Sequence, residues 1–381
     1  MRIIRLANFV APCSGGMRTA LRELGTGYVA AGHESVLVVP GPDHREEETE
    51  QGRVITLPGP IVPGTGGYRV IAARRPLRRL LDELRPDRIE VSDRTTLRWT
   101  GDWARERGIP SVMVSHDSLA GLLRMFGPRQ LPLDRISDRL NLETAESYGV
   151  VLCTTEWAAA EFRRLDIPNL VRVPLGVDLA RFSPDRRDER LRSSLAAPDE
   201  ALLVHCSRLS PEKRPERAVD ALAELRRRGV PAALAVVGEG PRRRALEERA
   251  AGLPVRFLGH VADRELLAGV LATADVAIAP GPVETFGLAA LEALASGTPV
   301  VVSNESALPE VIGLAGLSVD DSGAAYADAV EQLLAREERQ RRVAARAQAE
   351  RYDWQTAVDG FLRAHGLEPV RASTDVPRLH G

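Results

Sequence analysis

Two glutamates separated by seven residues, Glu284 and Glu292, are placed where both carboxylates could serve one ligand. The apolar run at 275–280 predicts a buried strand, and the periodicity at about 286–296 predicts the helix that follows it. Glu284 then lies in the loop at the carboxyl end of a strand, and Glu292 lies inside the next helix. Because open α/β sheets bind ligands outside the carboxyl ends of their strands, this arrangement indicates a binding crevice.

The start of the predicted helix adds groups that bind anions. The backbone N–H groups of Phe286, Gly287 and Leu288 would be free there, and the N-terminus of a helix attracts phosphate. One carboxylate can then hold a sugar while the other accepts hydrogen bonds from ribose hydroxyls. The alternative is an ordinary helix with one solvated glutamate and one glutamate favoured by the helix dipole.

The run E-T-F-G-L-A-A-L-E, followed by A-S-G-T-P-V-V, resembles the E-x7-E signature of the large retaining glycosyltransferase family 4. The glutamate spacing alone is weak evidence, but the surrounding run is specific. The resemblance extends over nearly the whole chain. It implies an α/β protein of the GT-B fold, with two Rossmann-like domains facing each other across a cleft. It also implies that Glu284 holds the donor sugar and that Glu292 takes the ribose.

A basic segment, R-L-S-P-E-K-R at 208–214, follows a predicted strand in the second half. Negative charge grows on a departing diphosphate as the glycosidic bond breaks, so fixed cations stabilise the transition state. Arg208 can bind two oxygens at once, and Lys213 supplies a point charge. The segment is similar to the family's G-R-L-x-x-E-K-G, which implies that both residues hold the diphosphate. Ser207 and Arg214 stand where that pattern has glycine.

The first half supplies a glycine turn and a histidine. Gly15 and Gly16 follow the first predicted strand, and without side chains they let a substrate approach the backbone, although a tight turn also explains them. The resemblance places this loop beside the donor phosphate and the acceptor. His116 and Asp117 follow the predicted strand 111–115. The resemblance implies that His116 contacts the donor sugar, whereas Asp117 orients it, meets the acceptor or caps the next helix.

Two more loops are similar to nucleotide-binding loops of the family. Gly238 begins G-E-G-P, in the place of G-x-G-P, although a simple turn is also an adequate explanation. Val261 follows Gly259 and His260, in a loop where relatives stack the base against the main chain. These residues complete the predicted donor site, in which no metal ligand is expected because no D-x-D motif ends a strand.

Length and resemblance together predict how the chain is divided. The 381 residues suffice for two domains, each with its own core. We expect an acceptor-side Rossmann-like domain over residues 1–183 and a nucleotide-sugar-binding domain over residues 184–351. Residues 352–381 should form a crossing helix and a tail that return to the first domain.

Composition excludes several other classes of protein. The net charge of −2 provides no basic field for nucleic acid. The three cysteines are far apart and show neither zinc spacing nor a disulfide framework, which favours buried thiols in a reducing cytosol. We see no signal peptide and no apolar run long enough to cross a membrane. The expected location is therefore cytoplasmic.

One basic segment leaves contact with a membrane open. A helix is expected over 68–85, interrupted at Pro76, with five arginines between 69 and 79. A basic amphipathic helix can lie on the anionic inner face of the plasma membrane, and lipid-modifying relatives use such a patch. The solvated face of an ordinary surface helix is the favoured interpretation.

The resemblance implies a retaining hexosyltransferase that needs no metal or other cofactor and releases GDP or UDP. The runs S-G-G-M-R-T-A-L and E-V-S-D-R-T-T-L-R are most similar to actinobacterial α-mannosyltransferases that use GDP-mannose. The expected acceptor is a hydroxyl of a glycolipid or mannoside. The alternatives are a UDP-GlcNAc or UDP-glucose transferase acting on a secondary-metabolite or aminocyclitol core, and a catalytically silent binding module. The presence of Arg208, Lys213, Glu284 and Glu292 argues against the silent module.

Overall fold

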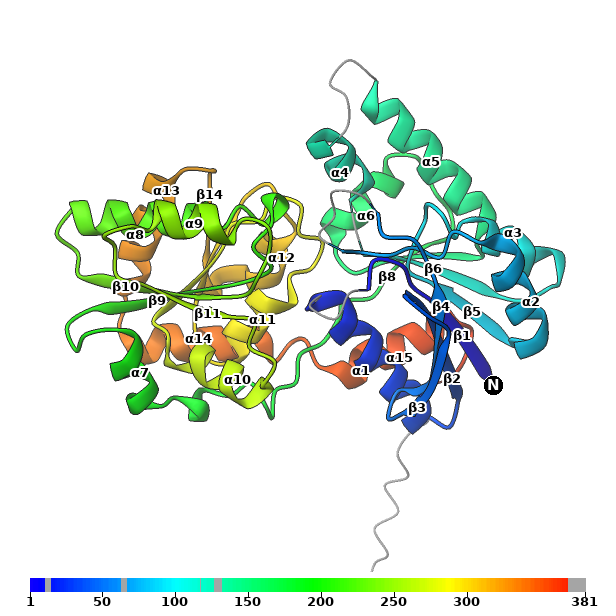
Figure 1. Ribbon diagram of the computed structural model, residues 1–381, viewed down its shortest axis with the longest axis horizontal. Helices are drawn as coiled ribbons and strands as arrows, with labels where there is room; N and C mark the ends of the chain where they lie inside the picture. The colour runs from blue at the N-terminus through cyan, green and yellow to red at the C-terminus, as the bar shows by residue number, and fades with distance from the viewer. Residues whose placement is uncertain (11–14, 63–66, 117, 127–131, 369–381) are drawn as a thin grey trace, which may run out of the picture.

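The computed structural model describes residues 1–10, 15–62, 67–116, 118–126 and 132–368. The chain forms two lobes, each built around a mostly parallel sheet with helices packed on it (Figure 1). We call the lobe that holds residue 1 the N lobe and the other the C lobe. This arrangement is the predicted α/β architecture.

The N lobe contains an eight-stranded sheet in the order β3-β4-β2-β1-β5-β6-β7-β8. β3 pairs antiparallel with β4, and the other neighbours are parallel. The order reverses between β1 and β5, which marks the switch point where such sheets bind ligands. The strands are β1 (Arg2–Leu6), β2 (Glu34–Gly41), β3 (Arg45–Thr49), β4 (Gly52–Pro58), β5 (Arg88–Val91), β6 (Ser111–Ser115), β7 (Val150–Cys153) and β8 (Leu170–Arg172).

Helices cover both faces of this sheet, and one of them comes from the far end of the chain. Helix α15 packs against α1, so the C-terminal part of the chain returns to the N lobe (Figure 1). Beside it, Val177 forms a parallel bridge with Asp353 where the two chain crossings meet. The helices are α1 (Gly16–Ala30), α2 (Arg74–Leu84), α3 (Trp99–Glu106), α4 (Leu119–Phe126), α5 (Leu133–Ser147), α6 (Glu156–Arg163) and α15 (Trp354–Ala364).

The C lobe contains a six-stranded, all-parallel sheet in the order β11-β10-β9-β12-β13-β14. Its order reverses between β9 and β12, so the loops after these two strands share one switch point. The strands are β9 (Ala201–Cys206), β10 (Ala232–Val237), β11 (Val255–Gly259), β12 (Val276–Ala279), β13 (Val300–Ser303) and β14 (Leu317–Val319). The helices are η1 (Pro184–Arg186), α7 (Glu189–Leu195), η2 (Pro211–Lys213), α8 (Glu216–Arg227), α9 (Arg243–Arg249), α10 (Arg264–Thr273), α11 (Leu288–Ala295), α12 (Leu308–Ile312), η3 (Gly313–Ala315), α13 (Gly323–Leu334) and α14 (Glu338–Ala349).

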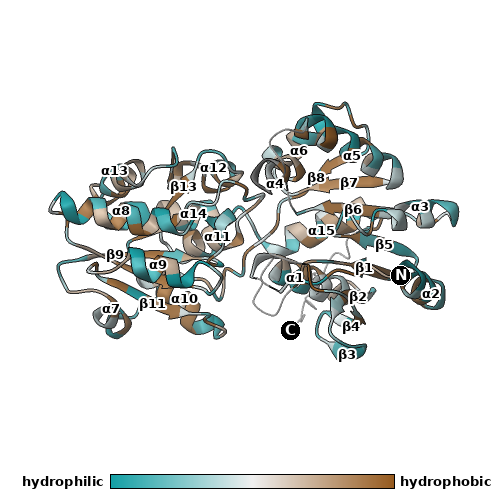
Figure 2. Cartoon of the chain, turned by 45° about the horizontal axis from the view of Figure 1, so that its top comes forward, coloured by the Kyte–Doolittle hydropathy of each residue, from teal (hydrophilic) through white to brown (hydrophobic). Residues whose placement is uncertain are grey.

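Buried apolar strands and amphipathic helices explain both lobes. Figure 2 shows most strands in brown, which marks hydrophobic residues. It shows teal, which marks hydrophilic residues, on outward helices such as α2 and α8. β10 is buried along its whole length, as expected of a central parallel strand covered on both faces. One hydrophobic cluster also passes between the lobes, because Leu24 and Val114 of the N lobe belong to the same cluster as Leu288 and Leu291 of the C lobe.

One local prediction in the N lobe was wrong. The helix expected over 68–85 begins only at Arg74, and Pro76 lies in its first turn, where a missing N–H costs nothing. Arg69 instead bridges to Ile61 in an extended segment. β3 has the sequence R-E-E-E-T, which contains no apolar run that would predict a strand. Every residue of β3 is exposed, so pairing with β4 rather than apolar burial explains this edge strand.

The first sheet uses residues between 2 and 172, and the second uses residues between 201 and 319. The domain limits at residues 183 and 351 stay a prediction. Within the described part of the chain, no helix combines the length and the apolar character that a membrane crossing requires.

Candidate functional site

The loop after β12 carries Glu284 and leads into α11. The helix begins at Leu288, slightly later than expected, because Gly287 adopts a left-handed conformation with φ of 77°. A Cβ atom at Gly287 would lie 2.2 Å from Cδ2 of Leu308, so this position also needs glycine for space. Among the described residues, the N–H groups of Phe286, Gly287 and Leu288 donate to no backbone carbonyl. They fit the anion-binding role predicted for this helix start.

Glu284 meets Lys213 from the neighbouring loop. Lys213 Nζ lies 2.5 Å from Glu284 Oε1, and the side chains remain 27% and 22% exposed. Lys213 ends the 3₁₀ helix η2, just after β9, so the switch point of the C-lobe sheet brings the two residues together. Arg208 pairs with Glu212 in the same loop. We call Arg208, Glu212, Lys213 and Glu284 the site cluster.

The N lobe reaches the site cluster through Thr285. Thr285 Oγ1 donates to the carbonyl oxygen of His116 at 2.5 Å, and Thr155 Oγ1 donates to the carbonyl oxygen of Thr285 at 2.8 Å. The residue next to Glu284 is therefore bonded to the segment that carries His116. The structure thus brings together two residues that were predicted separately from the two halves of the chain.

His116 is a neutral imidazole at pH 7. Burial lowers its pKa to about 4, although the negative charge of Glu90 opposes this shift. Its Nε2 atom lies 3.1 Å from Ser92 Oγ. A neutral ring suits a hydrogen bond to a sugar hydroxyl better than proton transfer near neutral pH. Asp117, which was predicted beside it, lies outside the described residues.

The glycine turn approaches the start of α11 from the N lobe. A Cβ atom at Gly16 would lie 3.9 Å from Cδ1 of Leu288, whereas one at Gly15 would meet nothing within 4 Å. Gly16 begins α1, whose N-terminus therefore lies near the N-terminus of α11. The structure brings Gly16 to Leu288 and leaves open space beside Gly15.

Glu292 lies deeper, at the junction of the lobes. It is only 6% exposed, and its Oε1 accepts a hydrogen bond of 2.7 Å from Arg264 Nη2. Burial raises the pKa of Glu292, and the positive charge of Arg264 partly opposes that rise. A small pocket opens on this carboxylate. It is lined by Thr19, Glu23, Gly176, Val177, Asp178, Arg264, Leu288, Glu292 and Trp354.

The two remaining predicted loops pack against the basic segment. Gly238 has φ of 136°, and a Cβ atom there would lie 1.8 Å from the carbonyl oxygen of Ser207, so only glycine fits. Gly238 also donates its N–H to the carbonyl of Gly259 at 2.7 Å. This bond links the loop after β10 to the loop of Val261, which is partly buried against the main core. Both loops thus border the strand ends that carry Arg208.

Three contacts of the site were not predicted. The Arg208 guanidinium lies 4.6 Å from the ring centre of Tyr68 in the N lobe. Thr285 joins the lobes as described above. The carboxylate of Glu310 accepts N–H bonds from Glu156 at 2.7 Å and Trp157 at 3.3 Å, and it pairs with Arg172 at 3.0 Å. A Pro-Glu pair after β13 was visible in the sequence, but nothing local shows that it caps α6 of the other lobe.

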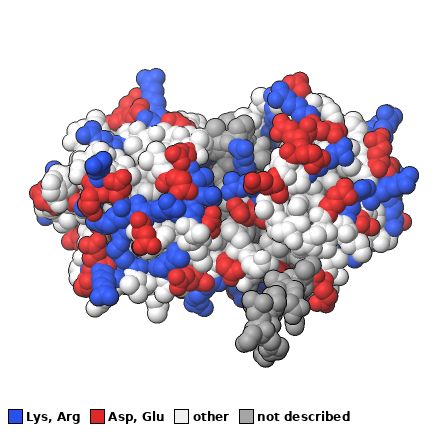
Figure 3. All heavy atoms as spheres, turned by 90° about the horizontal axis from the view of Figure 1, so that it is seen from below, with Lys and Arg blue, Asp and Glu red and all other residues white. Residues whose placement is uncertain are grey.

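Figure 3 shows the charged side chains on one face of the molecule. Figure 3 shows basic and acidic side chains interspersed over the visible face of both lobes. The small net charge of −2 provides no overall basic field that would favour a nucleic acid.

Comparison with protein families matches both halves of the chain. Residues 14–181 match the model described as Glycosyltransferase Family 4, and residues 186–350 match the model described as Glycosyl transferases group 1. The chain is 49% identical over 372 residues to a GDP-mannose-dependent alpha-(1-6)-phosphatidylinositol dimannoside mannosyltransferase of Mycobacterium tuberculosis, covering 97% of each chain. It is 30% identical to a glycogen synthase of the same species, covering 96% of this chain and 94% of the relative.

Solved structures show the same fold. Sucrose-phosphate synthase of Thermosynechococcus elongatus superposes with a TM-score of 0.75 at 23% identity, covering 96% of this chain and 98% of that one. Anabaena HepE in complex with UDP-glucose superposes with a TM-score of 0.75 at 18% identity, covering 96% of this chain and 99% of the other. The two-lobed architecture is therefore the one predicted from the E-x7-E stretch.

Proposed function

Because this chain belongs to glycosyltransferase family 4, we propose that it transfers mannose from GDP-mannose to a hydroxyl of a glycolipid, with retention of configuration at the sugar. The observation that carries the donor and acceptor assignment is the 49% identity over 97% of both chains to the mycobacterial phosphatidylinositol dimannoside mannosyltransferase. The arrangement of Glu284, Lys213, Arg208 and His116 around one junction supports the same reaction.

In this proposal the C lobe holds the donor. Arg208 and Lys213 bind the diphosphate, and the N–H groups at the start of α11 add further donors. Lys213 already pairs with Glu284 at 2.5 Å, but an ammonium has three donors. Lys213 can therefore keep this contact while it binds a phosphate oxygen. Glu284 and neutral His116 hold sugar hydroxyls, and Glu292 takes the ribose.

The proposed chemical step needs no general base from the protein. The bond between the anomeric carbon and the diphosphate oxygen breaks while the acceptor oxygen attacks from the same side. The departing diphosphate takes the proton of the acceptor hydroxyl. Arg208 and Lys213 stabilise the charge that develops on the leaving group, which is the charge that grows most in the transition state.

Calorimetric titration with GDP, GDP-mannose, UDP and UDP-GlcNAc tests the donor. We expect binding of the two guanine nucleotides and much weaker binding of the two uracil nucleotides. Preference for the uracil pair would overturn the GDP-mannose assignment in favour of a UDP-sugar transferase. Binding of none would instead favour a catalytically silent module.

Incubation with radiolabelled GDP-mannose and phosphatidylinositol dimannoside tests the acceptor. We expect label in the lipid extract, and boiled enzyme is the control. Label that appears on a free mannoside but never on the lipid would contradict the glycolipid proposal. Transfer to either acceptor would still eliminate the silent module.

Any contact with a membrane is proposed to be electrostatic rather than apolar. The arginines of α2 at 74, 75, 78 and 79 are exposed, whereas Leu77, Leu81 and Leu84 are buried in the N-lobe core. The apolar face of α2 is thus already covered, and only the charged face of this helix is available to a membrane. Binding to anionic vesicles that persists in high salt would contradict this view.

A further inference from the structure

The carboxylate of Glu292 is held from one side by a single arginine. Arg264 Nη2 donates to Oε1 at 2.7 Å, and Oε2 accepts no hydrogen bond from the described residues. Oε2 is not fully enclosed, and it therefore still reaches the pocket at the lobe junction. The enclosed space of this pocket is about 10 Å³, which is about what one water molecule needs. A ribose would therefore meet the carboxylate at the mouth of the pocket rather than inside it.

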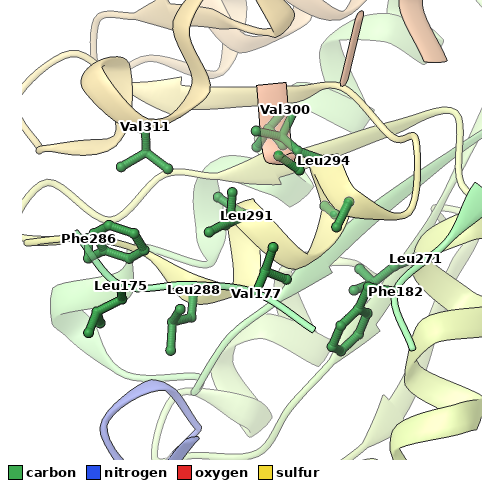
Figure 4. Packing of buried hydrophobic residues seen from close by; sticks show 14 of the residues in the cluster. Leu175, Val177, Phe182, Leu271, Phe286, Leu288, Leu291, Leu294, Val300 and Val311 are labelled. Carbon is green, nitrogen blue, oxygen red and sulfur yellow. The ribbon is translucent and has the colours of Figure 1, made fainter. Parts of the chain in front are cut away.

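Arg264 is itself fixed by its surroundings. It is the first residue of α10, whose preceding Asp263 caps the N–H groups of Glu265 and Leu266. Its guanidinium stacks on the ring of Phe182 at 5.0 Å from the ring centre. Phe182 is fully buried and lies beside Leu271 of α10 (Figure 4). Stacking and helix position together aim Arg264 at Glu292.

The groups that face Glu292 come from several elements and have opposing effects. The positive charges of Arg264 and of Arg22 on α1 favour its ionised form, whereas the negative charge of Asp178 disfavours it. Glu23 of α1 lines the same pocket, and Cys206 of β9 interacts electrostatically with Glu292. Burial is the largest effect and raises the pKa of Glu292. Among these groups, only Arg264 makes a hydrogen bond to the carboxylate.

A ribose diol needs this carboxylate in its ionised form. Two hydroxyl groups that both donate require an acceptor, and an ionised carboxylate only accepts, with room for about four hydrogen bonds. A protonated carboxyl would present its own O–H to the same hydroxyls. Arg264 uses one acceptor position on Oε1, so the remaining positions stay open to the pocket.

We propose that Arg264 is a positioning residue for the donor, which orients Glu292 and keeps it ionised so that it accepts both ribose hydroxyls. The inference rests on the proposed function because it concerns the ribose of that same donor. The contacts from Phe182 through Arg264 to Glu292 would then connect the packing at the lobe junction with the binding of the nucleotide.

Calorimetry with GDP and 2′,3′-dideoxy-GDP, on wild type and Arg264→Gln, tests the proposal. A hydrogen bond to a charged group corresponds to about a tenfold change in Kd. We expect Arg264→Gln to weaken GDP about tenfold and to leave the Kd of dideoxy-GDP within about twofold of wild type, because the diol is then absent. Arg264→Lys, which keeps the positive charge, should recover part of the loss.

Arg186→Gln is the matched control. Arg186 pairs at 3.0 Å with Glu265, which lies next to Arg264 on α10. Both side chains of this pair are about half exposed. Its removal should leave both Kd values unchanged. Thermal melting of each variant checks the fold. Should Arg264→Gln fail to fold, Arg264→Lys carries the test through the two ligands: its Kd for GDP should weaken by less than about tenfold, and its Kd for dideoxy-GDP should stay within about twofold of wild type.

The pH dependence of GDP binding is a further measurement, and it would not change if Arg264 had only a structural role. Removing the positive charge raises the pKa of Glu292 further, so the carboxylate is lost at a higher pH. As pH falls, GDP binding should therefore weaken earlier in Arg264→Gln than in wild type or Arg186→Gln. Equal weakening of both ligands with an unchanged profile would overturn the inference. Failure of wild type to bind GDP would instead overturn the donor assignment on which it rests.

Discussion

Two groups of paired charges, one at the lobe junction and one inside the N lobe, differ chiefly in their exposure. In the site cluster, Lys213 and Glu284 are 27% and 22% exposed. In the group that we call the core cluster, Arg5, Tyr28, Glu90 and His365, the pair Arg5–Glu90 is 0% and 1% exposed. Arg5 and Glu90 lie on neighbouring strands of the N-lobe sheet, whereas Lys213 and Glu284 lie after strands of the C-lobe sheet. Only the second pair leaves its polar atoms within reach of a ligand.

In the core cluster, both carboxylate oxygens of Glu90 accept hydrogen bonds from residues inside the protein. Arg5 Nε donates to Glu90 Oε1 at 2.9 Å, and Tyr28 donates to Oε2 at 2.6 Å. His365 Nε2 reaches the same Oε2 at 3.2 Å. Burial alone would raise the pKa of Glu90, but Arg5 and His365 hold it well below its ordinary value. Because His365 follows α15, this enclosed carboxylate also ties the end of the chain to the N lobe.

The comparison separates two uses of charge in one fold. A fully enclosed pair keeps its two charges bonded to each other, and breaking it leaves an uncompensated buried charge. A half-exposed pair gains little stability, since water screens it, but it can exchange partners when a ligand arrives. Four substitutions test this distinction.

The largest effect should come from the core cluster. Glu90→Ala leaves the Arg5 guanidinium buried without its carboxylate, which costs about 3–5 kcal/mol. Urea unfolding followed by circular dichroism measures this loss. The control Glu34→Ala removes an exposed pair with Arg2 and should cost under about 1 kcal/mol. Similar losses in the two variants would contradict the distinction.

The same cluster predicts loss of stability in acid. The pKa of Glu90 is lower in the folded protein than in the unfolded chain, so its stabilising contribution is fully present above the unfolded value. This contribution falls as the pH drops below that value. The difference in free energy of unfolding between wild type and Glu90→Ala should therefore narrow as the pH falls from 7 to 3.

The next effect should appear in activity rather than stability. Glu284→Gln and Lys213→Ala each remove an interaction proposed to stabilise the transition state, worth about 10²–10³-fold in kcat. The free energy of unfolding should change by less than about 1 kcal/mol, because both side chains are partly exposed. Initial rates of mannosyl transfer measure the loss, and Glu248→Gln, from an exposed pair with Arg244, is the control. Rates near wild type would remove these residues from the proposed mechanism.

The smallest effect should come from a contact that joins the two lobes. Glu310 is 29% exposed, and it joins the lobes by accepting N–H bonds at the start of α6. Glu310→Gln weakens these charge-assisted bonds by about 1 kcal/mol. We expect a larger radius of gyration by X-ray scattering and a few-fold lower kcat. Glu305→Gln removes only a 3.9 Å contact with Arg214 and should change neither. An unchanged radius would mean that other contacts alone hold the lobes together.

Much of the fold could be predicted from the sequence because parallel strands are continuous apolar runs. The strands around β9 and β12 were found in this way, and with them the loops that carry Lys213 and Glu284. The same rule failed for β3, whose charged residues gain their structure from a neighbour. It also failed near Arg69, where apolar residues were read as a helix although they form an extended segment.

The candidate site, too, could be predicted only in part from the sequence. The sequence by itself determined which side chains lie at strand ends, since strand, turn and helix are encoded within a few neighbouring residues. It did not determine their partners. Arg264 and Glu292 are 28 positions apart, Thr285 and His116 are 169 apart, and His365 and Glu90 are 275 apart. Those contacts depend on sheet order and on how the two lobes meet, which only the packing of the whole chain decides.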